Sequence, residues 1–112
     1  MMNAQSKTKN LNAMNPADML SRAEDAEKYL KTIANKTRLM ILCSLLENEL
    51  SVSDLLSRIA VTQPVISQHL ALLRESEMVA TRRDGQTIYY RLADERVERT
   101  IALLYEFFCK EE

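Results

Sequence analysis

The chain contains a single glycine, Gly85, which directly follows Asp84 between two segments of alternating polar and apolar residues. Asp-Gly is a favoured pair for a two-residue hairpin turn, because both turn positions can require positive φ. The alternation runs over residues 87–92, and Met78–Arg82 precedes the turn as the partner segment. We therefore predict one β-hairpin with its turn at Asp84-Gly85.

The rest of the chain favours helices. It has one glycine and two prolines in 112 residues, and it is 46% hydrophobic, enough for a core. Leu, Glu, Lys, Arg and Ala are abundant, and these residues have high helix propensity. Helices are expected to start near Asn15, Asn35 (running to about Glu47), Ser51, Thr62 and Asp94. At Ser51, a capping-box-like pair with Asp54 is expected.

Two of the predicted helices carry apolar residues at heptad spacing. In the first helix the stripe consists of Met19, Ala23, Ala26, Leu30 and Ile33. In the last it consists of Val97, Ile101, Leu104 and Phe108. Such a stripe packs along another helix, and a domain of this size gains stability from dimerising.

The predicted order is α-α-α-α-β-β-α, mainly helical with one β-hairpin. Two short helices joined by a tight turn and followed by a hairpin form a winged helix-turn-helix. We expect a flexible N-terminal arm over residues 1–14 and one domain over residues 15–112. Within that domain, residues 50–92 would form the DNA-binding unit, while 15–34 and 94–109 would be the dimerisation helices.

The second helix of such a unit, here called the reading helix, enters the major groove of DNA with its N-terminal residues against base edges. The candidate DNA-binding residues in it are Thr62, Gln63, Ser67, Gln68 and His69. Gln pairs in a bidentate manner with adenine, and Ser is more permissive. Further basic candidates for contacts to phosphates and to the minor groove are Arg74, Arg82, Arg83 and Arg91. The alternative is a helical hairpin whose polar face is only solvated. The motif order, the wing turn and the arginine placement together favour DNA reading.

Charge is segregated along the chain, although the net charge is only −1 and the pI is about 5.9. Residues 58–91 carry five arginines and three acidic residues, a net charge of +2. Residues 94–112 carry six acidic and three basic residues, a net charge of −3. One face could therefore be basic while another is acidic, so a low pI does not exclude DNA binding.

Four segments resemble the ArsR/SmtB family of bacterial repressors: Ala34–Leu42, Glu49–Leu55, Ser67–Arg74 and Asp84–Leu92. The similarity spans residues 19–109. It implies a homodimer built by the first and last helices that binds inverted-repeat operator DNA.

Family metal sites are not expected in this chain. The positions of a Cys-x-Cys pair used by some members read Ser51-Val52-Ser53, and the only histidine lies in the predicted reading helix. A zinc site normally needs four N, S or O ligands. Asp94, Glu95 and Glu98 are better interpreted as a solvated helix start. We predict no metal and no cofactor.

The two cysteines, Cys43 and Cys109, have two interpretations. By sequence alone both are readily explained as small apolar residues on helix faces. Their placement resembles the dithiol, persulfide-sensing sub-branch of the family (SqrR-, BigR-, YgaV- and HlyU-like regulators). That resemblance implies a repressor that releases its operator when reactive sulfur species link the two cysteines by a di- or polysulfide bridge. The alternatives are a sensor of arsenite or another thiophilic metalloid, and an antirepressor or activator that displaces a nucleoid protein.

Other classes of protein are disfavoured. There is no apolar stretch of membrane-spanning length and no signal-peptide pattern, so we expect a cytoplasmic protein with no membrane partner. There is no phosphate-binding loop, no ligand cluster, and no Ser or Cys paired with a convincing His base, so we expect no enzyme.

Overall fold

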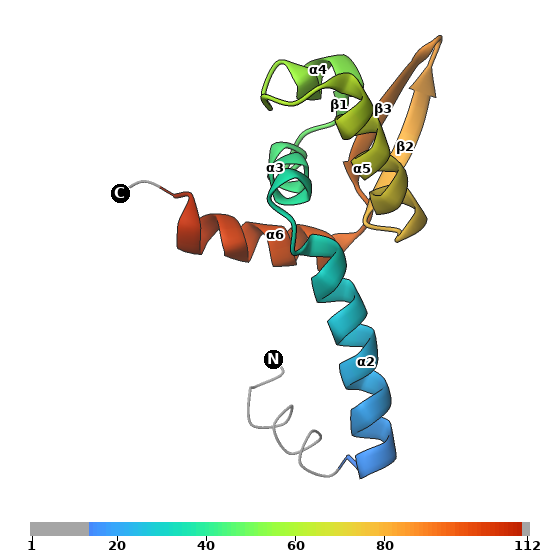
Figure 1. The fold of residues 1–112 in the computed structure, drawn as a ribbon, viewed down its shortest axis with the longest axis vertical. Helices are drawn as coiled ribbons and strands as arrows, with labels where there is room; N and C mark the ends of the chain where they lie inside the picture. Colours follow the sequence, from blue (N-terminus) through green and yellow to red (C-terminus); the bar gives the residue numbers. More distant parts are fainter. Residues whose placement is uncertain (1–13, 111–112) are drawn as a thin grey trace. The chain divides into compact units, whose positions relative to one another are not determined.

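The computed structural model describes residues 14–110, and its helices and strands follow the predicted order with one addition (Figure 1). The helices are α2 (Pro16–Ile33), α3 (Lys36–Ser44), α4 (Val52–Leu56), α5 (Gln63–Glu75) and α6 (Glu95–Phe108). The strands are β1 (Leu50–Ser51), β2 (Val79–Asp84) and β3 (Thr87–Leu92). The arm expected over residues 1–14 lies, except for Met14, outside the described residues. The described part of the chain divides into two units, one that ends at residue 31 and one that begins at residue 32.

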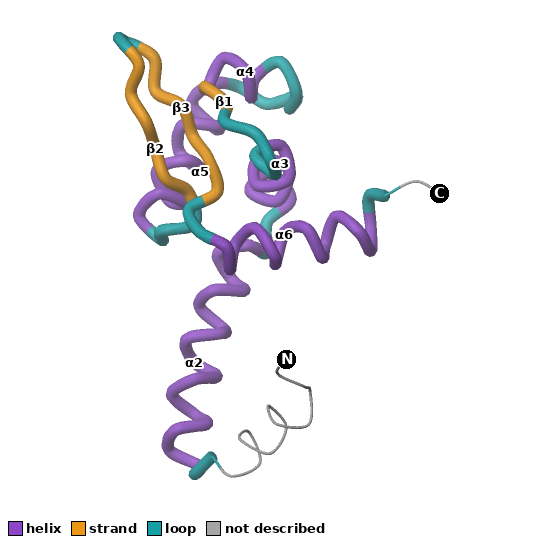
Figure 2. The backbone as a smooth tube through the Cα atoms, turned by 180° about the vertical axis from the view of Figure 1, so that it is seen from behind, coloured by secondary structure: helices purple, strands orange, loops and turns teal. Residues whose placement is uncertain are grey.

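The hairpin of β2 and β3, called the wing from here on, is part of an antiparallel sheet of three strands in the order β1-β3-β2 (Figure 2). Strands β2 and β3 pair from Val79 opposite Leu92 to Asp84 opposite Thr87. On its other side β3 pairs with β1, where Leu50 lies opposite Tyr90. The sequence did not predict β1, because two residues are too short to show a period.

The turn of the wing lies one residue later than predicted. Because Asp84 pairs with Thr87, the two turn residues are Gly85 and Gln86, and Asp84 belongs to the strand. Gly85 has a φ of 65°, whereas Gln86 is not among the described residues with positive φ. Glycine at the first turn position is typical of a type II′ turn, whose twist suits a hairpin.

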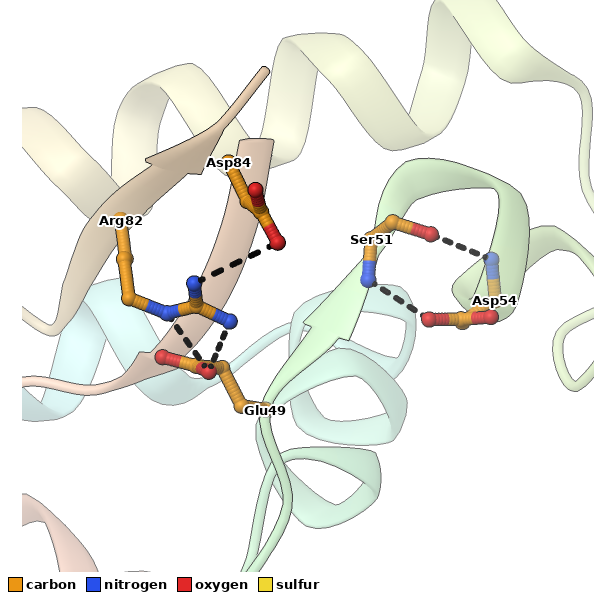
Figure 3. Close-up of polar contacts among 5 residues, drawn as sticks. All are labelled: Glu49, Ser51, Asp54, Arg82 and Asp84. Carbon is orange, nitrogen blue, oxygen red and sulfur yellow. Dashed lines mark hydrogen bonds and ion pairs between the residues drawn. The ribbon is translucent and has the colours of Figure 1, made fainter. Parts of the chain in front are cut away.

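Side-chain caps fix where the helices begin. The predicted capping box of α4 is confirmed: Asp54 N donates to Ser51 Oγ at 3.1 Å, and Ser51 N donates to Asp54 Oδ2 at 2.9 Å (Figure 3). Asn15, Asn35 and Asp94 also accept hydrogen bonds from the backbone of their helices.

Two helix ends differ from the prediction. Thr62 occupies the N-cap position of α5, but its side chain makes no capping hydrogen bond. Helix α3 ends at Ser44, earlier than the predicted end near Glu47. Glu47 has a φ of 62°, a left-handed conformation that cannot continue a right-handed helix.

The core of residues 32–110 surrounds α3, which packs against both α5 and α6. Ile41, Leu42 and Leu45 are buried, together with Ile66, Leu70, Leu73, Val97 and Ile101 from the two neighbouring helices. The predicted stripe of the last helix is therefore divided. Its first half is buried inside this chain, while Phe108 is 81% exposed. In α2 only Ile33 is buried.

Helix α5 ends in a Schellman motif. Met78 N donates to the Leu73 carbonyl and Glu77 N donates to the Arg74 carbonyl, while Leu73 and Met78 are both buried. Glu77 has a φ of 60°, the left-handed conformation that this motif requires. A residue with a side chain is strained there, and glycine is not.

We expect Glu77→Gly to raise the free energy of unfolding by roughly 0.5–1 kcal/mol, the relief of strain less the entropy that glycine adds to the unfolded chain. Urea denaturation at one protein concentration measures the change. Glu75→Gly is the matched control, since it removes the same charge inside the helix and should lower stability by up to about 1 kcal/mol. Equal effects of the two variants would contradict the interpretation.

Candidate nucleic-acid interface and cysteine pair

Helix α5 separates an apolar side from a polar side, as a reading helix must. Ile66, Leu70 and Leu73 are buried. Thr62, Gln63, Ser67 and Gln68 are exposed at and after the start of the helix. Their amide and hydroxyl groups are thus exposed, and contacts of these groups with base edges stay a prediction.

His69 differs from these exposed residues because it is half-buried and has a protein neighbour. Its Nδ1 lies 3.4 Å from Nη1 of Arg38, in the first turn of α3. The Nε of Arg38 donates to the carbonyl of Thr32, and its backbone N–H donates to Asn35 Oδ1 at 3.0 Å. Sequence reasoning missed Arg38, because it lies 31 residues from His69.

A concavity lies between α5 and strand β3. It is lined by Ser67, Leu70, Ala71, Arg74, Glu75 and Tyr90. Arg74, which was predicted to contact DNA, therefore lines the same concavity as Tyr90, which was not among the predicted DNA-binding residues. The sequence predicted Tyr90 only as part of the alternating segment 87–92, and nothing in that pattern indicated that it borders the reading helix.

The wing places its three candidate arginines on two faces. Side chains alternate along a strand, and directly paired residues share a face. Arg82 pairs with Tyr89, and Arg91, two residues further along β3, lies on that same face. Arg83 pairs with Ile88, two residues from Tyr90, on the face that borders α5. The structure thus separates Arg83 from Arg82 and Arg91.

Arg82 is engaged by the protein itself (Figure 3). Its Nε and Nη2 both donate to Glu49 Oε1, at 3.0 and 2.8 Å, and its Nη1 lies 4.0 Å from Asp84 Oδ2. The guanidinium also lies 4.8 Å from the centre of the Tyr89 ring, a cation–π distance. These contacts tie the outer strand of the wing to the residue before β1. A phosphate contact by Arg82 stays a prediction.

The ion pair shifts the titration of Glu49. The hydrogen bond from Arg82 is the largest cause that lowers the pKa of the Glu49 carboxyl, and the charges of Arg82 and Arg91 add to it. The pKa of Asp54 is also lowered, by its hydrogen bonds with Ser51. Both carboxylates therefore stay ionised at a lower pH than an ordinary carboxyl group does.

The two cysteines lie close together. Cys43 is on α3 and half-buried, and Cys109 caps the C-terminal end of α6 and is exposed. Burial is the largest cause that raises the pKa of the Cys43 thiol, followed by the charge of Cys109 and a hydrogen bond with Cys109. The two thiols therefore lie within interaction distance, although they are far apart in sequence.

Two other kinds of feature are absent from residues 14–110. No group of three or more His, Cys, Asp and Glu residues in this range could hold a metal ion. No helix in the same range is long and apolar enough to cross a membrane.

We expect Glu49→Gln to remove a pH-dependent part of the stability. A carboxylate whose pKa is lowered by folding adds stability above its unfolded-state pKa and loses it as pH falls through its folded-state pKa. In urea denaturation, the difference between wild type and variant should be constant above about pH 5 and shrink as the pH falls below the ordinary pKa of glutamate, about 4.3. Asp54 titrates alike in both proteins, so its contribution cancels. Glu47→Gln makes the same charge change two residues away and leaves the Arg82–Glu49 ion pair in place, so a matching trend in this variant would contradict the assignment.

Comparisons with known proteins agree with this architecture. The family model described as bacterial regulatory protein, arsR family, matches residues 35–81. The transcriptional activator HlyU of Vibrio cholerae is 44% identical over 97 residues, which are 87% of this chain and 90% of that protein. The biofilm growth-associated repressor of Xylella fastidiosa is 41% identical over 99 residues, 88% of this chain and 87% of that protein. The solved structure of reduced HlyU from Vibrio cholerae has a TM-score of 0.80 at 44% identity, covering 83% of this chain and 98% of that one. The chain belongs to the ArsR family and is a DNA-binding transcriptional regulator with a winged helix-turn-helix.

Proposed function

We propose that this protein is a repressor that releases its operator when a persulfide-derived di- or polysulfide bridge links Cys43 and Cys109. The observation that carries the proposal is the proximity of the two thiols, from α3 and from the end of α6. They are the only two cysteines in the chain. A bridge therefore has one intramolecular pairing.

The exposure of the two thiols suggests an order of reaction. Cys109 is exposed, so a sulfur donor reaches it first, whereas burial and a raised pKa keep Cys43 protonated at neutral pH. The Cys109 thiolate attacks the outer sulfur of a persulfide RSSH, which gives a Cys109 persulfide and releases RS⁻. Cys43 then loses its proton and attacks the Cys109 sulfur, which forms the disulfide and expels HS⁻. In total two thiols are oxidised and one persulfide is reduced to a thiol and hydrogen sulfide; further donor molecules lengthen the bridge.

The position of α3 connects the bridge to DNA reading. Helix α3 packs against α5 on one side and α6 on another, and Cys43 lies in it. A bridge from Cys43 to the end of α6 would fix α3 against α6 and change the support under the reading helix. In a dimer the two reading helices must meet half-sites about one turn of DNA apart, so a small displacement weakens binding.

We further propose a homodimer formed through α2 and α6 that binds an inverted repeat. Large apolar side chains are exposed on both helices: Met19, Leu20, Leu30, Leu103, Tyr105, Phe107 and Phe108. Apolar surface of this extent on a small chain indicates a protein partner. A second copy is the partner that an operator of two half-sites requires.

One relative is named a transcriptional activator, and this supports a second proposal, in which DNA binding by this protein activates transcription. A regulator that displaces a nucleoid protein from a promoter would activate transcription by binding DNA in the same way. A reporter gene in a deletion strain separates the two outcomes. Higher expression without the regulator supports repression, and lower expression supports antirepression.

We expect glutathione persulfide to weaken operator binding of the wild-type protein by at least about tenfold, in line with usual allosteric coupling. The DNA is a duplex selected from a random pool by the reduced protein, and fluorescence anisotropy measures the affinity. Tandem mass spectrometry should find a peptide pair that joins Cys43 to Cys109. Reduction should restore binding.

Cys43→Ser and Cys109→Ser should each bind the duplex when reduced and keep binding it after persulfide treatment. Parallel samples with arsenite and with peroxide separate the inducers. Release by arsenite with no response to persulfide would replace the sulfur switch by a metalloid sensor. Full release of either serine variant by persulfide would refute the bridge.

We expect Leu30→Asp in α2 and Leu103→Asp in α6 to shift the protein toward the monomer in sedimentation equilibrium, because each places a charge on the proposed dimer surface. Leu72→Asp is the matched control, since Leu72 is exposed on α5 in the DNA-binding unit. It should leave the dimer intact. A monomeric wild type at micromolar concentration would contradict the homodimer.

A further inference from the structure

The Arg38 side chain connects three segments of the chain. Its Nε donates to the carbonyl of Thr32, which precedes α3, and its Nη1 lies 3.4 Å from Nδ1 of His69 in α5. Its own backbone is held by the Asn35 cap. The guanidinium is therefore fixed at its base and at one nitrogen, with another nitrogen directed at the imidazole.

The chemistry of these two groups determines which imidazole nitrogen carries the proton. A guanidinium carries hydrogen-bond donors only and stays charged in proteins. The contact at 3.4 Å is therefore a hydrogen bond only if His69 Nδ1 accepts. A neutral imidazole with an accepting Nδ1 carries its proton on Nε2.

We propose that Arg38 is a positioning residue for DNA reading, which holds His69 in the Nε2–H tautomer and fixes the orientation of its ring on the reading helix. His69 then meets DNA as a neutral donor through Nε2, toward a phosphate oxygen or a base acceptor, and not as a cation. The proposal rests on α5 as the reading helix, which the proposed function shares, and does not depend on the cysteine bridge.

The first test observes the imidazole without DNA. His69 is the only histidine in the chain, so untagged, nitrogen-15-labelled protein gives the signals of a single ring. Long-range proton–nitrogen spectra at pH 8, where imidazoles are generally neutral, identify the protonated nitrogen. We expect a protonated Nε2 and an Nδ1 signal displaced by its hydrogen bond. In Arg38→Met the Nδ1 signal should move to the position of an imidazole without that bond.

Lys36→Met is the matched control, because it removes one positive charge from an exposed position in the same turn of α3. It should leave both nitrogen signals unchanged. A wild-type proton on Nδ1, or an Nδ1 signal that ignores Arg38→Met, would overturn the proposal whatever the protein does with DNA or sulfur.

The second test asks whether Arg38 acts through His69. Arg38→Met should weaken binding to the selected duplex about tenfold in the wild-type background and by much less in the His69→Ala background. The slope of affinity against salt should not change, whereas loss of a direct phosphate contact would reduce it by about one. Equal losses in both backgrounds, or a reduced slope, would show that Arg38 contacts DNA itself. Circular dichroism confirms folding, and Arg38→Lys serves as the milder variant, which keeps the charge but not the planar group.

Discussion

Helix α3 is the short segment against which both α5 and α6 are packed. It packs against both α5 and α6, and its Ile41 and Leu42, like Leu45 just after its end, are almost completely buried. Three of its nine residues are buried, Thr37, Ile41 and Leu42, whereas Arg38 and Cys43 are half-buried at the edge of the core. Arg38 lies on that edge toward α5, and Cys43 lies on it toward the end of α6. Helix α5 and the cysteine pair thus both lie against one short helix, so in the proposed switch a bridge at Cys43 would act on α5 without a long path through the protein.

The order and start of the elements could be predicted from sequence because each depends on near neighbours. Asn15, Ser51 and Asp54 act within three residues of themselves, and helical periodicity shows in any segment of several turns. The prediction failed where the deciding contact is distant or the segment is short. Strand β1 exists because it meets the middle of β3, about forty residues later in the chain. The turn moved by one residue because strand register, and not the Asp-Gly pair alone, decides which residues are left unpaired.

In the candidate site, too, features set by near neighbours were predictable and features set by distant contacts were not. The exposed polar side of α5 and the halves of the cysteine pair were visible as residue types at helical positions. The partners Glu49 and Arg38 were not, since each lies more than thirty residues from the side chain it contacts. Arg82 shows how a distant partner can mislead an interpretation from sequence. Its charge indicated phosphate binding, yet in the folded protein that charge is shared with Glu49, Asp84 and the ring of Tyr89.

The position of the cysteines near the two ends of the folded unit has a consequence for the lifetime of the protein. A bridge between Cys43 and Cys109 would enclose about 65 residues, including the whole of α4, α5 and the wing, and would restrict the unfolded chain by about 4 kcal/mol in the loop-entropy description. The oxidised regulator would then resist proteases better than the reduced one, because digestion proceeds through opened states. A cell would end the signal by reducing the bridge, since turnover of the protein would be slowest in the form that no longer holds DNA.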